Sequence, residues 1–472
     1  MPLPDTVKTF LENHSLPYRV VPFSLGDTLI QAAKTLDLPP RRIIRAVLLR
    51  DRGSIVMAIL PCSHILDFSL LCQLLGRELE PLYGRESTGV LRDCLPGSYP
   101  PLPNAFSLFA LVDDSLADHN AEEIYFDGGS GDTLIGMKGT DYQALLTSIR
   151  WEHFAISVDE FDSALDQQNL TPQNLSDLTH RYTPTLPEEN SEAIIKLPEL
   201  PNNVHDIMDL HANPDTTLDD IIPIIERDPG LAAQVFYWAR SSLHGQHSAV
   251  NSLDVAIQQI LGFDKTLHLI LGSTLGQLFN LPLDGPAGLQ AFWRHSVYCA
   301  AVVGELVKFL PDYTQVKPGL AYLSGLLHDI GYLVLGHSFP ARYFLFNRFL
   351  AVNRHTPISA VERYVLGTEH WHIGAWLLQA WRMPEELIAA VRWHHHEDCT
   401  QPHAAYSNLV LIANRLLHHI GLSEDQNGHL PALAMFTLGI SREQAMFALE
   451  RVQSSMAELD ALSGILRLPP QT

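Results

Sequence analysis

The sequence lacks several features that would assign a chain to a class at once. Its 472 residues include only five cysteines, scattered and without a CxxC pair, which argues against a zinc ribbon or a disulfide framework. It has no run of 18 uninterrupted apolar residues, so no membrane span is expected. The N-terminal stretch MPLPDTVKTFLENH has no apolar core of the kind that a secretion signal needs. These absences together predict a cytoplasmic protein without a membrane partner.

Positive charge is also scarce. There are 31 Lys and Arg residues against 53 Asp and Glu residues, for a formal net charge of −22 at pH 7. Because nucleic-acid phosphates must be neutralised by Lys and Arg, general affinity for nucleic acid is not expected. A chain of this length is expected to form two or three domains. The segment 151–195 holds nine acidic residues and one basic residue, so we interpret it as an acidic linker between domains at 1–150 and 196–472.

The two predicted domains differ in their patterns. In the first, helical spacing predicts helices at TVKTFLENHSL and TLIQAAKTLDL, started by Asp5 and Asp27. The runs IIRAVLL, SIVMAIL and FSLFALV predict strands, and IYFDGGSGDTLIGM predicts two more with a glycine-rich turn. From Ile194 onward the pattern is almost wholly helical. The predicted fold class is therefore multidomain, an N-terminal α+β domain followed by an all-α domain.

Histidines in the helical part are candidates for a metal site. The candidate ligands, each flanked by residues expected to face a core, are His295, His328, Asp329, His370, His394 and His395, with one or both of the last two in use. A buried carboxylate is costly unless it is paired, hydrogen-bonded or bound to a metal. Imidazoles and a carboxylate from four helices can enclose one or two divalent ions, here Fe, Mn, Zn or Mg. The alternative is a polar core network in which Asp329 is hydrogen-bonded to a histidine and no metal is present.

The order H…HD…H…HH resembles the HD metal-dependent phosphohydrolase superfamily. The pattern of that superfamily closes with an Asp on a later helix, where this chain offers Asn414 in NLVLIANRLLHH. A neutral amide is a weaker ligand and removes one negative charge from the site. This resemblance implies a metal-dependent phosphohydrolase as one possible activity, with the Asn for Asp exchange counting against turnover.

A narrower resemblance covers roughly 196–400. The stretches LPELPNNVHDIMDLHANPDTTLDDIIPIIERDPGLAAQVFYWARSS, SLDVAIQQILGF, AYLSGLLHDIGYLVLGH and GTEHWHIGAWLLQAWRMPEELIAAVRWHHH resemble, in order, the HDOD family. That family is the HD-related output domain of bacterial signalling proteins. The resemblance implies a non-catalytic regulatory module whose partner is a signalling protein or a small ligand.

The first 150 residues resemble the YbaK/prolyl-tRNA-synthetase-associated family, which removes wrongly attached amino acids from tRNA. The resemblance lies in QAAKTLDLPPRRIIRAVLL, SIVMAILP, DCLPGSYPPLP and IYFDGGSGDTLIGMKGTDYQALL. It implies an aminoacyl-tRNA deacylase pocket with Arg45 and Gly97 in catalytic roles and with Pro100 and Pro101 contacting substrate. Active members carry a Lys where Arg45 stands, and the two side chains are not interchangeable. The alternative is a pocket kept for a small ligand, or for stability alone.

The main hypothesis from the sequence is thus a cytoplasmic bacterial signalling or regulatory protein, and the sequence favours this role over that of an active enzyme. Its HDOD-like domain would be the output, and its YbaK-like domain would sense a small ligand or the acceptor end of a tRNA. The competing hypotheses are an aminoacyl-tRNA deacylase in the N-terminal domain and a metal-dependent phosphohydrolase at the HD site.

Overall fold

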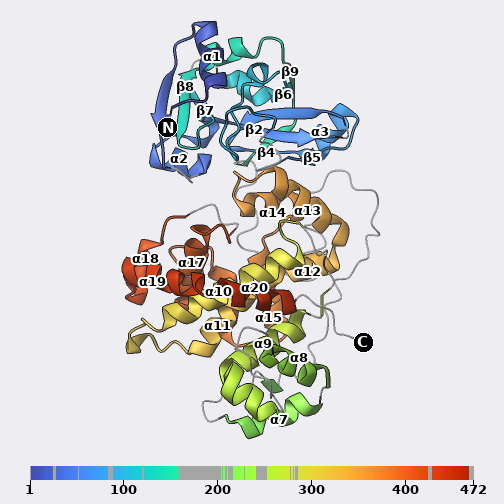
Figure 1. Ribbon diagram of the computed structural model, residues 1–472, viewed down its shortest axis with the longest axis vertical. Coiled ribbons are helices and arrows are strands. Elements are labelled where there is room, and N and C mark those ends of the chain that lie inside the picture. Colours follow the sequence, from blue (N-terminus) through green and yellow to red (C-terminus); the bar gives the residue numbers. More distant parts are fainter. Residues whose placement is uncertain are drawn as a thin grey trace. The chain divides into compact units, whose positions relative to one another are not determined.

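A computed structural model of the chain describes residues 2–24, 28–51, 53–82, 89–119, 122–158, 204, 206–207, 210, 216–227, 229–240, 252–276, 278–279, 281, 285–423 and 428–466 (Figure 1). The chain divides into two compact units. The first comprises Met1–Gln167 and Arg348–Val365, and the second comprises Gln168–Asn347 and Leu366–Thr472. The first unit therefore includes a short segment from the helical half of the sequence.

The first unit is built on a mixed sheet with the strand order β1-β8-β7-β2-β3-β6-β9, and β5 pairs with β2. The strands are β1 Arg19–Pro22, β2 Ile43–Arg50, β3 Ile55–Pro61, β5 Glu80–Pro81, β6 Phe109–Asp113, β7 Glu123–Asp127, β8 Thr133–Lys138 and β9 Arg150–Glu152. The predicted runs at IIRAVLL, SIVMAIL and FSLFALV are β2, β3 and β6, and the glycine-rich turn joins the antiparallel strands β7 and β8. A separate antiparallel pair is formed by β4 His64–Leu66 and β10 Ala155–Ser157.

Strand β2 lies near the middle of this sheet and is buried on both faces. It pairs with β3 antiparallel, from Ile44 opposite Pro61 to Arg50 opposite Ile55. Side chains alternate between the faces of a strand. Ile44 and Ala46 pack in one core cluster, whereas Ile43 packs in another. Helices α1 Asp5–His14 and α4 Gly139–Leu145 cover the first face, α2 Leu29–Thr35 covers the second, and α3 Phe68–Leu75 follows β4.

The starts of the first two helices test the predicted caps. Asp5 is the first residue of α1, and Pro4 holds the N-cap position, so Asp5 as a cap is wrong. Pro4 already has an extended conformation, which leaves Asp5 to favour the helix as a charge in its first turn. The predicted cap Asp27 lies outside the described residues, and Thr28 caps α2 in a reciprocal capping box with Gln31.

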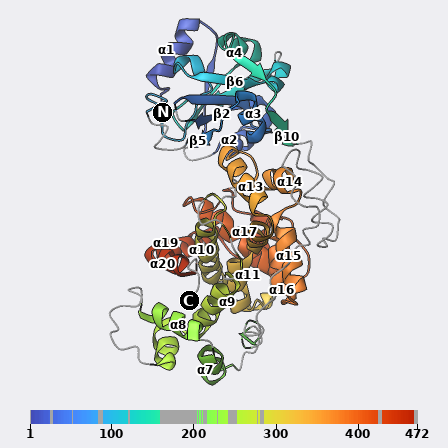
Figure 2. The same cartoon turned by 90° about the vertical axis from the view of Figure 1, so that its right-hand side faces the viewer.

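The second unit is helical, as predicted (Figure 2). Its described helices are α7 Leu218–Arg227, α8 Pro229–Arg240, the π-helix Val255–Leu261, α9 Phe263–Gly276, α10 Leu289–Val307, α11 Pro318–Leu327, α12 Ile330–Ser338, the first part of α13 Pro340–Val352, α15 His370–Ala380, α16 Glu385–Trp393, α17 Ala404–His418, α18 Ala432–Leu438, α19 Arg442–Gln453 and α20 Met456–Leu466. Helix α14 Ile358–Leu366 falls in the first unit except for its last residue. The long helix α10 packs against α11, α17, α19 and α20, which places it at the centre of the bundle.

The predicted linker falls largely outside the described residues. Of the segment 151–195, the part that the structure describes includes the end of β9 and the whole of β10, both in the first unit.

Within the described part of the chain, one helical run, Pro318–Ser338, is long and apolar enough to cross a membrane, with a mean hydropathy of 1.2. In the structure 83% of this apolar window is buried inside the protein. The run is divided between α11 and α12, and its apolar side chains form part of the core of the helical bundle.

Candidate functional site

The predicted metal ligands come together in the second unit, one from within a helix and the others at or beside helix ends. The ligands are His295 within α10, His328 and Asp329 between α11 and α12, His370 at the start of α15, and His394 and His395 directly after α16. The apolar run that carries His328 and Asp329 is interrupted at these two residues, because α11 ends at Leu327 and α12 begins at Ile330. Consecutive side chains in a helix point about 100° apart. The interruption therefore lets these two neighbours face the same point.

The candidate ligand atoms form two groups that share Asp329. In each group the atoms all lie within 4.8 Å of one another. The α10 group is His295, His328 and Asp329, and the α15 group is Asp329, His370, His394 and His395.

The two oxygens of Asp329 face different groups. Oδ2 lies 3.1 Å from His328 Nε2 and 3.6 Å from His295 Nε2. Oδ1 lies 3.1 Å from His370 Nε2 and 3.5 Å from His394 Nε2. Within each pair the imidazole nitrogens also approach each other, to 3.1 Å for His295 and His328 and to 3.3 Å for His370 and His394. One carboxylate thus stands between two pairs of converging nitrogens.

Backbone carbonyls fix the orientation of three of these rings. The Nδ1 atoms of His295, His328 and His394 lie 2.7, 2.9 and 2.8 Å from the carbonyl oxygens of Leu422, Gly325 and Val391. A carbonyl oxygen can only accept, so Nδ1 carries the proton in each ring. In the neutral rings of His295 and His394 the Nε2 lone pair is then directed at the cluster, as metal-binding histidines require. Despite its burial, the neighbouring Asp329 raises the pKa of His328 well above its usual value, so a metal ion would have to displace a proton from this ring.

Burial keeps much of the cluster in the protonation state that a metal ion needs. It lowers the pKa of His394 to about 3 and holds the pKa of His395 well below its usual value. For Asp329 the effect of burial is overcome by the neighbouring His328, which holds the pKa of the carboxyl well below its usual range. Metal ions bind deprotonated carboxylates and neutral imidazoles. Little proton release would therefore oppose metal binding at His394, His395 and Asp329.

Asn414 of α17 lies next to the α10 group, beside His295. Its side chain is buried beside His295, and its Oδ1 has no hydrogen-bond partner among the described residues. A buried acceptor without a donor costs free energy. The unsatisfied oxygen, the converging imidazoles and the ionised carboxylate together fit a divalent cation.

Glycines allow the helices that carry these ligands to approach closely. A Cβ atom on Gly331 would lie 1.9 Å from the carbonyl oxygen of His370, and one on Gly325 would lie 2.7 Å from the Cα of Ala300. No side chain fits at such distances. Gly331 therefore sets the contact of α12 with α15 that places Asp329 beside His370, and Gly325 does the same for α11 and α10.

In the first unit, the residues predicted for a deacylase pocket lie on two faces of the sheet. Arg45 of β2 is 1% exposed. It alternates with Ile44 and Ala46, whose cluster includes Cys94, Leu102 and Tyr142 around the loop of Gly97, Pro100 and Pro101. Tyr142 donates a hydrogen bond to the Pro101 carbonyl at 2.8 Å, which ties the loop to that face. Strand alternation thus directs the Arg45 side chain to the face opposite the loop.

The loop itself is held by a buried carboxylate. Asp127 accepts hydrogen bonds from the backbone N–H groups of Tyr99 at 2.7 Å and Gly129 at 2.8 Å. Burial raises the pKa of Asp127 to about 6, although these donors act in the other direction. Gly97 has a φ of 99°, which glycine adopts without strain. The loop is rigidly supported, with Gly97 exposed.

A third acidic group, Asp113 with Asp114 and His153, has ligand-like spacing but a structural role. Asp113 accepts the N–H groups of Phe154 at 2.8 Å and Ala155 at 2.7 Å through Oδ2, and it accepts both donors of Ser115 through Oδ1. Four donors use the lone pairs of a carboxylate. Asp113 therefore anchors the start of β10 and has little capacity left for a metal.

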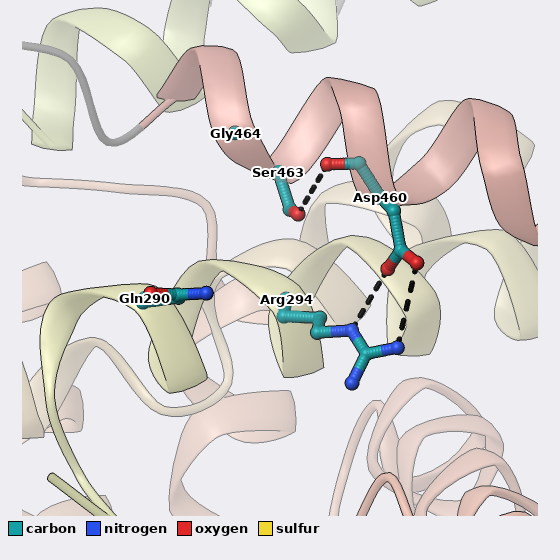
Figure 3. A pocket seen from close by; sticks show the side chains of 5 residues that line it. All are labelled: Gln290, Arg294, Asp460, Ser463 and Gly464. Carbon is teal, nitrogen blue, oxygen red and sulfur yellow. Dashed lines mark hydrogen bonds and ion pairs between the residues drawn. The ribbon is translucent and has the colours of Figure 1, made fainter. Parts of the chain in front are cut away.

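A polar pocket of about 320 Å³ lies between α10 and α20, lined by Gln290, Arg294, Asp460, Ser463 and Gly464 (Figure 3). Arg294 points toward Asp460, with Nε 2.8 Å from Oδ1, and Ser463 bonds the Asp460 carbonyl (Figure 3). Tyr298 donates to the same carboxylate at 3.0 Å. Arg294, the cation among the described residues that line this pocket, is therefore already neutralised.

The fold and the histidine cluster define a chain with an α/β domain and an HD-type helical domain. Residues 197–397 match the model of the HDOD domain, and residues 25–145 match that of the aminoacyl-tRNA editing domain, so both predicted domains are present. A crystal structure from Marinobacter aquaeolei VT8, named as a candidate signal transduction protein, is similar over 99% of this chain and all of that one, with 27% identity and a TM-score of 0.83. A protein of unassigned function from Treponema pallidum (strain Nichols) is 25% identical over 244 residues, which are 52% of this chain and 45% of that protein.

Sequence reasoning found the histidine cluster but missed the partner of Arg45. Asn353 lies 308 positions away, in AVNRHTP, and is 1% exposed. No local pattern marks a buried asparagine at a helix end, so only the fold could identify it.

Proposed function

We propose that this chain is a cytoplasmic regulatory protein of bacterial signal transduction whose HDOD domain binds divalent metal and, through it, an anionic ligand. The observation that carries the proposal is the position of Asp329 between two pairs of imidazole nitrogens. The similarity along nearly its whole length to a protein named for signal transduction supports the regulatory part. The N-terminal domain would bind a small ligand or the acceptor end of a tRNA and act as the sensor.

Charge favours ligand binding over turnover at this site. Among the described residues, the candidate ligands include one carboxylate, Asp329, whereas Asn414 and the imidazoles are neutral when they coordinate. A bound divalent ion would supply a positive charge that holds and polarises a phosphate group. With so little negative charge from the protein, an anion bound there would be held strongly and released slowly. Such a site suits recognition of a phosphate or phosphate ester.

Elemental analysis of the full-length protein tests the metal. After reconstitution with Fe, Mn, Zn or Mg and desalting, we expect stoichiometric metal in the wild type. We expect loss in His328→Ala and Asp329→Asn. His372→Gln is the matched control, because this histidine is two positions from His370 but pairs with Glu369. A wild-type protein that keeps no stoichiometric metal, or a control that loses it equally, would contradict the proposal.

A metal-dependent phosphohydrolase is the second candidate, favoured by the same cluster. Asp329 and His295 have side chains 14% and 17% exposed, so solvent reaches the site. The metal-loaded protein would be incubated with bis-p-nitrophenyl phosphate, and binding of inorganic phosphate would be measured by calorimetry. Phosphate binding without release of nitrophenol supports the regulatory role, whereas metal-dependent turnover abolished by Asp329→Asn replaces it with the enzymatic one.

Aminoacyl-tRNA deacylation is the third candidate, and its support is the match at 25–145. The buried position of Arg45, on the face opposite the Gly97 loop, argues against it. Incubation with mischarged Ala-tRNA or Cys-tRNA is expected to give ester hydrolysis no faster than buffer. Hydrolysis that depends on the Gly97 loop would reinstate this activity.

A further inference from the structure

Two hydrogen-bond donors of the first unit converge on a single oxygen atom. Arg45 Nη2 and the backbone N–H of Leu66 each lie 2.8 Å from Asn353 Oδ1. All three residues belong to the first compact unit, because the segment Arg348–Val365 is part of it. A guanidinium and a backbone N–H aimed at one oxygen form the donor arrangement that proteins use to bind carboxylates and other oxyanions.

The rest of the Asn353 carboxamide is also engaged. Its Nδ2 donates to the Leu66 carbonyl at 3.1 Å and to the Phe349 carbonyl at 3.0 Å. The side chain therefore pairs with both backbone groups of Leu66, as a neighbouring strand would. Because Arg45 and the Leu66 N–H can only donate, the oxygen of the amide must face them, which fixes its orientation.

The same segment is attached at two further points. Arg348 Nη2 donates to the Leu79 carbonyl at 3.1 Å, with its guanidinium over the Phe68 ring. Tyr364 donates to Asp67 at 2.6 Å. These contacts lie beside the Asn353 contact, so displacing Asn353 frees the middle of the segment while its ends limit how far it moves.

The Asn353 amide oxygen is not the strongest hydrogen-bond acceptor that Arg45 and the Leu66 N–H could bind. Arg45 also donates to the carbonyls of Val352 and His64, each at 3.1 Å, so these acceptors and Asn353 are all neutral oxygens. A carboxylate adds the attraction of opposite charges to these hydrogen bonds, and it can accept two parallel N–H bonds from one guanidinium. The lowered pKa of His355, to about 3, has the Arg45 charge as a cause after burial, which fits a local positive potential.

We propose that Arg45 and the Leu66 N–H form a binding site for the carboxylate of a small molecule, occupied in cis by Asn353. A carboxylate ligand competes with Asn353 and frees the part of the segment next to Asn353, while the contacts of Arg348 and Tyr364 hold its ends. Ligand binding in the N-terminal unit thereby controls the end of α13 and the connection to α14. This site is independent of the histidine cluster and of the function proposed for it.

Hydrogen exchange on the full-length wild type, with acetate as the probe, tests the displacement. We expect sodium acetate to accelerate amide exchange in peptides covering 349–353 severalfold and to saturate, while the amide of Leu66 stays protected because acetate replaces Asn353 as its acceptor. Sodium chloride at equal ionic strength should leave both unchanged, and acetamide should act more weakly than acetate. Acceleration at Leu66 as well would mean general loosening and would overturn the proposal, as would equal effects of acetate and chloride.

Substitutions at Arg45 and Asn353 test whether these two residues cause the acetate response. Arg45→Met should abolish the acetate response, and Asn353→Ala should give fast exchange at 349–353 even without acetate. Arg42→Met is the matched control, because Arg42 is a half-buried arginine of the same unit that donates to the Glu123 carbonyl at 2.6 Å, and it should respond like wild type. An undiminished acetate response in folded Arg45→Met would contradict the proposal. If Arg45→Met does not fold by circular dichroism, the wild-type comparison of acetate, acetamide and chloride decides alone.

Discussion

The two compact units each bury a charge, and they satisfy it in opposite ways. In the first, the cation of Arg45 is surrounded by oxygen acceptors that complement it. In the second, the anion of Asp329 is surrounded by imidazole nitrogens, which approach one another as closely as they approach the carboxylate. Nitrogen lone pairs that converge in this way repel one another unless a proton or a cation lies between them.

The two sites also differ in whether their side-chain oxygens are already hydrogen-bonded. Around Arg45, Asn353 uses its oxygen and both amide hydrogens in bonds within the protein. Around Asp329, the unsatisfied Oδ1 of Asn414 and the converging rings leave capacity for a cation. The comparison leads to four predictions, in order of decreasing effect.

Metal removal should lower the stability of the helical unit alone. Stabilisation by a ligand present at a thousandfold its dissociation constant is about 4 kcal/mol. We expect a chelator to reduce the free energy of unfolding of the second unit by about this amount and to leave the first unit unchanged, as followed by hydrogen exchange in urea. Asp329→Asn should remove the effect of the chelator. A chelator effect on both units, or on neither, would remove the distinction between them.

Gly331→Ala should disrupt the site from outside its ligands. The new Cβ would overlap the His370 carbonyl, so we expect a loss of about 3 kcal/mol or more in the free energy of unfolding, together with loss of metal. Gly464→Ala is the control, since a Cβ there meets nothing within 4 Å. In the α20 helix this change should stabilise the protein by about 0.5–1 kcal/mol. Similar unfolding curves for the two variants would show that close approach of α12 and α15 is not required.

Acid should weaken the first unit through His355. Burial, followed by the charges of Arg45 and Arg354, lowers the pKa of this imidazole to about 3. Below a pH of about 6.5 the unfolded chain takes up a proton that the folded unit does not, so the contribution of His355 to stability falls as the pH falls from about 6.5 toward 3. Between pH 8 and pH 5 we expect a loss of about 1–2 kcal/mol in the free energy of unfolding of this unit. His355→Leu should show a smaller loss, whereas the exposed control His14→Gln should behave like wild type; equal pH dependence in all three would contradict the assignment.

Loss of the Arg294–Asp460 ion pair in Figure 3 should have the smallest effect. Its side chains are 39% and 46% exposed, and exposed pairs contribute about 0.2–1 kcal/mol. We expect Arg294→Ala to reduce the free energy of unfolding by less than about 1 kcal/mol and to leave metal content unchanged. A loss of metal would mean that α10 transmits changes at this pocket to the adjacent His295.

The sequence predicted the fold where its pattern is local. IIRAVLL and SIVMAIL have the β-branched composition of strands, and they pair as β2 and β3. The spacing of His295, His328, Asp329, His370 and His394 was enough to predict that they meet, because each is flanked by core residues. Whether a metal binds there stays a prediction.

Other features depend on contacts that no local pattern encodes. The break between α11 and α12 falls inside an apolar run that reads as one continuous helix. Arg45 is hydrogen-bonded to Asn353, which lies 308 positions away in the sequence. The residue that the sequence predicted to be catalytic is therefore buried. Both follow from tertiary packing rather than from propensity.

The sharing of Asp329 has a consequence for how ions would enter. Each oxygen of this side chain serves one group of imidazoles, so the first ion to arrive draws on the same negative charge that the second requires. Loading is therefore expected to be stepwise, with a tight first step and a weaker second step set by the metal concentration around the protein. The number of ions bound beside Asp329 would therefore change in two separate steps as the metal concentration rises.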